Sequence, residues 1–95
     1  MKKIYVVGIG PGSPDYILPI AMKCINQAKV LIGSKRALET LAPKTAITKT
    51  ITKDIGQLLD FIENTITTTD VVVMVSGDPG FYSLLASLKG RFPVE

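Results

Sequence analysis

Histidine is absent from this chain of 95 residues, and cysteine occurs only once, as Cys24. A single cysteine excludes a disulfide within the chain, and the cysteine and histidine ligands of a zinc site are missing. Without a histidine, Cys24 also lacks the usual base partner of a nucleophilic thiol. We therefore expect no metal site, a Cys24 that packs as a small apolar side chain, and a chain that resides in the reducing cytoplasm.

Long apolar runs are also missing. The longest covers residues 71–75, far fewer than the roughly 20 residues that a membrane-spanning helix needs. The start is similar to a signal peptide in one respect, because two lysines precede apolar residues, but the glycines and prolines of residues 8–14 interrupt the apolar core that such a peptide requires. We expect neither a membrane span nor a secretory leader.

Composition and charge are those of one globular domain with a modest core, with 46% apolar and 20% charged residues. The net charge of +3 is unevenly distributed: residues 23–53 contain seven basic side chains and one acidic, whereas residues 54–88 contain five acidic and none basic. This uneven charge has two interpretations. Either the basic and acidic segments form two solvated faces, or the basic segment forms a rim that attracts a polyanionic substrate. Nucleic acid is not expected, because no aromatic residue interleaves with the basic ones.

Strands and helices are expected to alternate along the chain. Apolar runs predict strands at residues 3–7, 29–32, 46–50 and 71–75, and the start of a fifth at 92–95; helical spacing predicts helices at 17–28, 34–41, from 55 to the loop at 67–69, and from 81 to Lys89-Gly90. Ser34 and Asp54 are the expected N-caps. The alternation predicts one three-layer α/β domain, with a mostly parallel sheet of four or five strands flanked by helices. Because the pattern stops within an element at Glu95, we expect the chain to be the amino-terminal half of a longer protein, or a chain that has lost its partner segment.

The first of two glycine turns covers residues 8–13, Gly-Ile-Gly-Pro-Gly-Ser, directly after an apolar strand. It differs from the dinucleotide-binding fingerprint, because Ser13 replaces the third glycine and no acidic residue follows the second strand. It also lacks the Gly-Lys-Ser/Thr ending of a Walker loop. A tight turn without a ligand remains the alternative for these glycines.

The second glycine turn covers residues 76–80, Ser-Gly-Asp-Pro-Gly, and leads into Phe81 and Tyr82. The carboxylate of Asp78 can accept hydrogen bonds from an amine, a ribose or backbone N–H groups, and the alternative is an N-cap for the last helix. Tyr82 lies off the apolar stripe of that helix, which makes it a better candidate than Phe81 to face a ligand. Both turns follow parallel strands, so we expect them at the same sheet edge, around a shared crevice.

At these turns the sequence resembles the tetrapyrrole (corrin/porphyrin) methylases, a family of S-adenosylmethionine (SAM)-dependent methyltransferases. Residues 7–15 are similar to the first signature of the family and residues 76–79 to the second. Together with residues 33–36 (Gly-Ser-Lys-Arg), the stretch 76–82 is most similar to the branch that methylates C5 of the corrin ring of precorrin-6Y or cobalt-precorrin-7 in cobalamin biosynthesis. The resemblance covers the whole chain. It implies that residues 1–95 are the amino-terminal domain of such a methylase and that the second, carboxyl-terminal domain is absent from this chain.

The resemblance also implies a site. The residues expected to contact SAM are Pro11, Gly77, Asp78, Pro79 and Phe81. Those expected to line the tetrapyrrole site are Gly10, Gly12, Ser13, Lys35, Arg36 and Tyr82. No catalytic residue is assigned, because the sulfonium is already activated and catalysis of this kind depends on positioning and exclusion of water. The resemblance further implies a homodimer of the full-length protein and a decarboxylating methyltransferase as partner. The alternatives are a non-catalytic α/β nucleotide-binding or regulatory module, and an inactive fragment.

Overall fold

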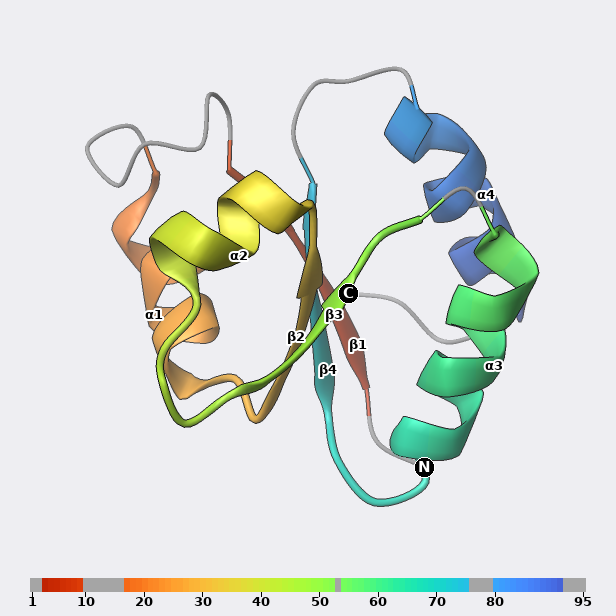
Figure 1. Cartoon of the computed structure of the whole chain (residues 1–95), viewed down its shortest axis with the longest axis horizontal. Coiled ribbons are helices and arrows are strands. Elements are labelled where there is room, and N and C mark those ends of the chain that lie inside the picture. Colours follow the sequence, from red (N-terminus) through yellow and green to blue (C-terminus); the bar gives the residue numbers. More distant parts are fainter. Residues whose placement is uncertain (1–2, 10–16, 53, 76–79, 92–95) are drawn as a thin grey trace.

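A sheet between two layers of helices forms the molecule (Figure 1). The computed structural model describes residues 3–9, 17–52, 54–75 and 80–91, without the side chains of residues 80–83 and 91. In chain order the elements are β1 (Ile4–Gly8), α1 (Pro19–Gln27), β2 (Val30–Gly33), α2 (Lys35–Leu41), β3 (Ile47–Thr50), α3 (Ile55–Thr65), β4 (Val71–Val75) and α4 (Gly80–Arg91). The expected alternation of strands and helices is confirmed.

The sheet has the strand order β1-β4-β2-β3, and every pair of neighbouring strands is parallel. Parallel neighbours need a crossover connection, which explains why a helix separates each strand from the next along the chain. The carboxyl ends of all four strands therefore point to the same edge of the sheet, which is uppermost in Figure 1. The parallel α/β class is confirmed with four strands; the fifth strand expected at residues 92–95 lies outside the described residues.

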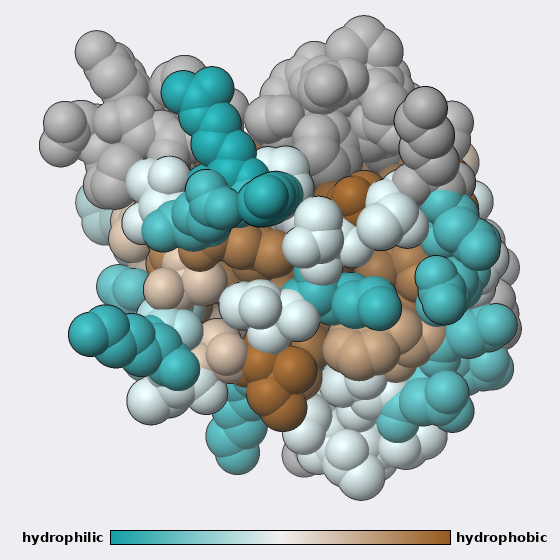
Figure 2. Space-filling model, in the orientation of Figure 1, coloured by the Kyte–Doolittle hydropathy of each residue, from teal (hydrophilic) through white to brown (hydrophobic). Residues whose placement is uncertain are grey.

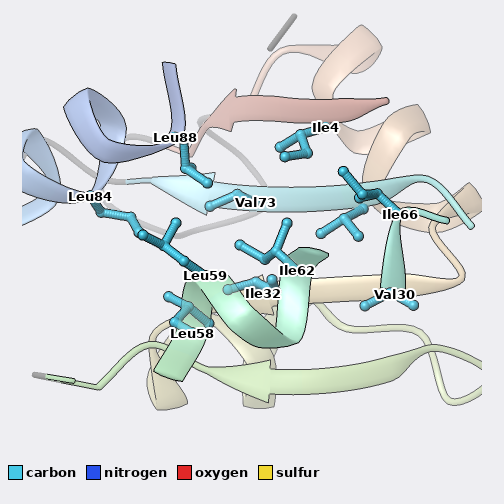
Figure 3. Packing of buried hydrophobic residues seen from close by; sticks show 11 residues of the cluster. Ile4, Val30, Ile32, Leu58, Leu59, Ile62, Ile66, Val73, Leu84 and Leu88 are labelled. Carbon is cyan, nitrogen blue, oxygen red and sulfur yellow. The ribbon is translucent and has the colours of Figure 1, made fainter. Parts of the chain in front are cut away.

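Each face of the sheet is buried beneath one pair of helices. On one face the strand residues Ile4, Val30, Ile32, Val71 and Val73 pack against apolar side chains of α3 and α4 (Figure 3). On the other face, the strand residues Val7, Leu31, Val72 and Met74 pack against α1 and α2. Burial on both faces explains the uninterrupted apolar run of β4, because a strand covered on both sides has no solvent-facing positions.

The ends of the helices follow local capping chemistry. The Ser34 hydroxyl accepts a hydrogen bond from the Ala37 backbone N–H at 3.1 Å, and Asp54 Oδ1 accepts one from the Gln57 N–H at 3.0 Å, so both expected N-caps are confirmed. The expected end of the last helix at Lys89-Gly90 is wrong, because α4 continues to Arg91. The backbone of Gly90 does not adopt the left-handed conformation of a glycine cap, so the glycine is an interior helix residue.

Candidate functional site

The carboxyl ends of β1 and β4 lie side by side at the upper edge of the sheet (Figure 1). Gly8 is paired in register with Val75, and the backbone N–H of Ile9 donates to the Val75 carbonyl at 2.9 Å. The two segments therefore leave the sheet as direct neighbours. Because each glycine turn begins at one of these strand ends, both turns start at the same edge, as the sequence predicts.

Most of the residues expected at the site lie outside the described residues. These are Gly10, Pro11, Gly12, Ser13, Gly77, Asp78 and Pro79. Phe81 and Tyr82 belong to the first turn of α4, and only their backbone is described. The shared crevice and the roles of these residues stay predictions. The described strand end is consistent with them, because Gly8 is exposed and a Cβ there would meet no heavy atom within 4 Å.

Lys35 and Arg36 lie at the same edge as the two turns. They are the first residues of α2, which follows directly from the carboxyl end of β2, and β2 is the neighbour of β4. Both side chains are exposed, and Ser34 caps the helix that carries them. Figure 2 shows hydrophilic side chains gathered over α2. The expected position of this cationic pair is confirmed, whereas its contact with a substrate stays a prediction.

Three other basic residues, Lys29, Lys44 and Lys49, lie elsewhere on the described part of the chain. Lys49 of β3 places its Nζ 5.4 Å from the centroid of the Phe61 ring on α3, so its charge is engaged in a cation–π contact. Lys29 immediately precedes β2 and Lys44 precedes β3, which puts both at the amino ends of strands. Among the described basic residues the positive charge is thus distributed over several elements, and Lys35 and Arg36 are the pair at the carboxyl end of β2.

A hollow of about 390 Å³ lies at the opposite edge of the sheet, beside the carboxyl end of α1. Its lining consists of Tyr5, Cys24, Gln27, Ala28, Lys29, Thr69, Asp70 and Val72. Asp70 Oδ1 accepts the backbone N–H of Lys3 at 2.8 Å, which ties the start of β1 to the start of β4. Sequence reasoning did not find this hollow, because its residues come from separate elements and form no motif. Parallel sheets bind ligands at the carboxyl ends of their strands, so the other edge remains the candidate site.

Cys24 is half-buried and packs against the apolar cluster beneath α1, as expected for a small apolar side chain. Within the described ranges, no group of three or more histidine, cysteine, aspartate or glutamate side chains could hold a metal ion. No helix in the described part of the chain has the length and apolar character needed to cross a membrane.

Two curated relatives share substantial sequence identity with the chain. One is the probable cobalt-precorrin-7 C(5)-methyltransferase of Methanocaldococcus jannaschii, 40% identical over 87 residues, which cover 90% of the chain and 41% of the relative. The other is the cobalt-precorrin-7 C(5)-methyltransferase of Salmonella typhimurium, 36% identical over 90 residues, or 95% of the chain and 44% of the relative. The chain therefore spans less than half the length of these proteins.

Two solved structures have the same fold. The methyltransferase CobJ superposes with a TM-score of 0.75 at 20% identity, covering 100% of the chain and 45% of CobJ. The cobalt precorrin-4 methyltransferase CbiF gives a TM-score of 0.67 at 23% identity, covering 98% of the chain and 44% of CbiF. The family model described as tetrapyrrole (corrin/porphyrin) methylases matches residues 3–92. Because that match extends over nearly the whole sequence, the chain belongs to the tetrapyrrole (corrin/porphyrin) methylases.

Proposed function

We propose that this chain is the amino-terminal domain of a SAM-dependent methyltransferase that methylates C5 of a corrin precursor, precorrin-6Y or cobalt-precorrin-7, in cobalamin biosynthesis. The names of relatives at 36–40% identity support this reaction. The structural observation that carries the proposal is the pairing of Gly8 with Val75, because it starts both family signatures at one point of the sheet edge. In this proposal, a ligand at the paired ends of β1 and β4 contacts both glycine turns.

The open space at the end of β1 supports a SAM site at this edge. When bound, SAM supplies a methyl group on a positively charged sulfur that is activated for attack by a carbon nucleophile. The exposed end of β1 leaves open space beside Gly8, where a ligand can approach the backbone. In the proposal Pro11, the turn of residues 77–79 and Phe81 hold the cofactor, with Asp78 as hydrogen-bond acceptor. Orientation and exclusion of water are then the main contributions of the protein to the rate.

The corrin substrate is placed against the cationic pair. A corrin precursor carries several carboxylates, and both Lys35 and Arg36 are exposed at the edge where the two turns begin. The guanidinium of Arg36 can bind one carboxylate through two parallel hydrogen bonds, whereas Lys35 acts as a mobile point charge. Gly10, Gly12, Ser13 and Tyr82 complete the proposed substrate surface.

The second half of the site belongs to the rest of the full-length protein in this proposal. The chain spans 41–45% of the two relatives and the two solved structures described above. A second domain that closes over the sheet edge would exclude water from the reacting atoms. We propose further that the full-length protein is a homodimer, that it acts in the cytoplasm, and that a decarboxylating methyltransferase is its partner.

The test uses protein from the complete reading frame that contains this chain. It is incubated with the corrin precursor and with SAM that carries an isotope-labelled methyl group. The proposal expects the label in the corrin, and nuclear magnetic resonance should place the new methyl group at C5. Binding of SAM without transfer would favour the nucleotide-binding or regulatory module. Absence of both binding and transfer would refute the methyltransferase assignment.

A further inference from the structure

The hollow at the amino ends of the strands has an apolar floor. These strand ends form the lower edge of the sheet in Figure 1. Tyr5 of β1 and Val72 of β4 both line the hollow, and they are paired in register on the face of the sheet that α1 and α2 cover. Cys24 and Ala28 line it from the side of α1. The volume of about 390 Å³ lies within the range of roughly 300–1,000 Å³ that is usual for small-molecule sites, so the hollow can hold a small ligand.

Opposite charges border this apolar floor. Lys29 and Asp70 both line the hollow, and they directly precede Val30 and Val71, which are paired in register. Asp70 is held toward β1, because one of its two carboxylate oxygens accepts the backbone N–H of Lys3 at 2.8 Å. Lys29 is exposed and precedes β2, on the other side of β4. Among the residues that the structure describes, no ion pair joins Lys29 to Asp70, so both charges remain available to a ligand.

A ligand that contacts both groups must carry both charges. An ammonium group donates to the carboxylate of Asp70, and a carboxylate accepts from the ammonium of Lys29. The carboxyl end of α1, which also borders the hollow, carries a partial negative charge and favours an ammonium as well. An aromatic ring packs on the Tyr5 ring more favourably than its buried area alone would give. An α-amino acid with an aromatic side chain combines these features in one small molecule.

We propose that the hollow is a binding site for a free aromatic α-amino acid. The ammonium of the amino acid contacts Asp70, and its carboxylate contacts Lys29. Its ring lies on the floor made by Tyr5 and Val72. The hollow is at the edge opposite the carboxyl ends of the strands, so an amino acid bound there leaves the proposed SAM and corrin positions free. Binding at the hollow is therefore independent of methyl transfer.

The test measures binding of L-phenylalanine to the protein from the complete reading frame by isothermal titration calorimetry. Two analogues keep the ring and only one charge: phenethylamine has the ammonium, and 3-phenylpropionate has the carboxylate. We expect each analogue to bind about fivefold more weakly than L-phenylalanine, which is the factor for one contact between opposite unit charges in water.

Cys24 supplies a local reporter, because it is half-buried and lines the hollow. Bound L-phenylalanine should slow the alkylation of this thiol by iodoacetamide at least about threefold at a saturating concentration, since the ligand covers the floor beside it. Mass spectrometry of the peptide that contains Cys24 follows the reaction at this thiol alone. The reporter therefore distinguishes binding in the hollow from binding elsewhere on the protein.

Two variants test the charged contacts. Lys29→Met keeps an apolar side chain and removes the charge, whereas Asp70→Asn keeps an oxygen that can accept the Lys3 N–H. Each should weaken L-phenylalanine binding about fivefold. Lys44→Met is the matched control, because Lys44 is also exposed and precedes a strand but does not line the hollow. It should leave binding unchanged. If Asp70→Asn does not fold, Lys29→Met and the two analogues decide the outcome.

No heat of binding and no slowing of Cys24 alkylation with L-phenylalanine would overturn the proposal. Equal binding of the one-charge analogues, or full affinity in Lys29→Met, would overturn it as well. If SAM slowed the alkylation as strongly as L-phenylalanine does, the hollow would belong to a cofactor site and the amino-acid site would be wrong. A protein that binds L-phenylalanine here but transfers no methyl group would refute the proposed function and leave this site in place.

Discussion

Removal of the cationic pair is the perturbation that most directly tests the substrate side of the site. The double variant Lys35→Ala/Arg36→Ala deletes two exposed charges at the start of α2 and leaves the cap from Ser34 to Ala37 in place. Neither side chain belongs to the apolar clusters, so the fold should persist. If the pair binds corrin carboxylates, the loss should appear in the KM for the corrin, and kcat should change little.

The size of the effect follows from the exposure of the two side chains. At a separation of 4 Å in water, opposite unit charges attract by about 1 kcal/mol, or a factor of about five in a binding constant. Two such contacts predict a rise in the corrin KM of about 25-fold at low salt. The screening length falls from about 10 Å at 0.1 M salt to about 3 Å at 1 M. At 1 M salt the variant and the wild type should therefore differ by no more than about threefold.

The assay is steady-state kinetics of the protein from the complete reading frame, at low and at high salt, with each substrate varied in turn. Lys23→Ala/Lys44→Ala is the matched control, since it removes the same two charges from exposed positions away from the strand ends that begin the turns. An unaltered corrin KM in the Lys35→Ala/Arg36→Ala variant would remove these residues from the site. An equal rise of the corrin KM in the Lys23→Ala/Lys44→Ala control would show that the charges act through the long-range electrostatic field of the protein and not through local contacts with the substrate.

Three further predictions concern caps, core and cofactor. Ser34→Ala removes the 3.1 Å cap of α2 and should lower the free energy of unfolding by about 1 kcal/mol; an unchanged urea midpoint would contradict the capping role. Ile62→Ala, at a fully buried position, should lower it by about 2–5 kcal/mol, whereas Ile47→Ala, at a position 62% exposed, should change it by less than about 0.5 kcal/mol. Equal unfolding curves for these two variants would be inconsistent with the described core. Asp78→Ala in the full-length protein should weaken SAM binding by about 1–3 kcal/mol in calorimetry. Residues 1–95 alone should bind SAM far more weakly than the full-length protein. Equal SAM affinity of the short and long proteins would show that the second half contributes nothing to the SAM site.

Local signals in the sequence were enough to predict the described elements and the starts of α2 and α3, whereas α1 begins at Pro19, two residues after the expected start. Ser34 and Asp54 begin α2 and α3 through side-chain hydrogen bonds that span only three residues, so no distant contact is needed to recognise them. The two glycine-rich signatures could be recognised in the sequence for the same reason, and their order along the chain indicated the family that the matched residues 3–92 confirm. The end of α4 was missed because Gly90 serves equally well as a cap or as an interior residue, and the residues near it do not distinguish the two.

Contacts between distant segments could not be predicted from local pattern. The insertion of β4 between β1 and β2 pairs Gly8 with Val75, although β2 and β3 lie between them along the chain. Strands that are buried on both faces are apolar throughout, so their sequences do not encode which neighbour they take. The packing of Met74 into the space at Gly33 likewise depends on side chains that meet only after the sheet and α2 have assembled. Residue types and spacing thus determined the elements and the family, whereas close packing across the strands determined which of those residues share one edge.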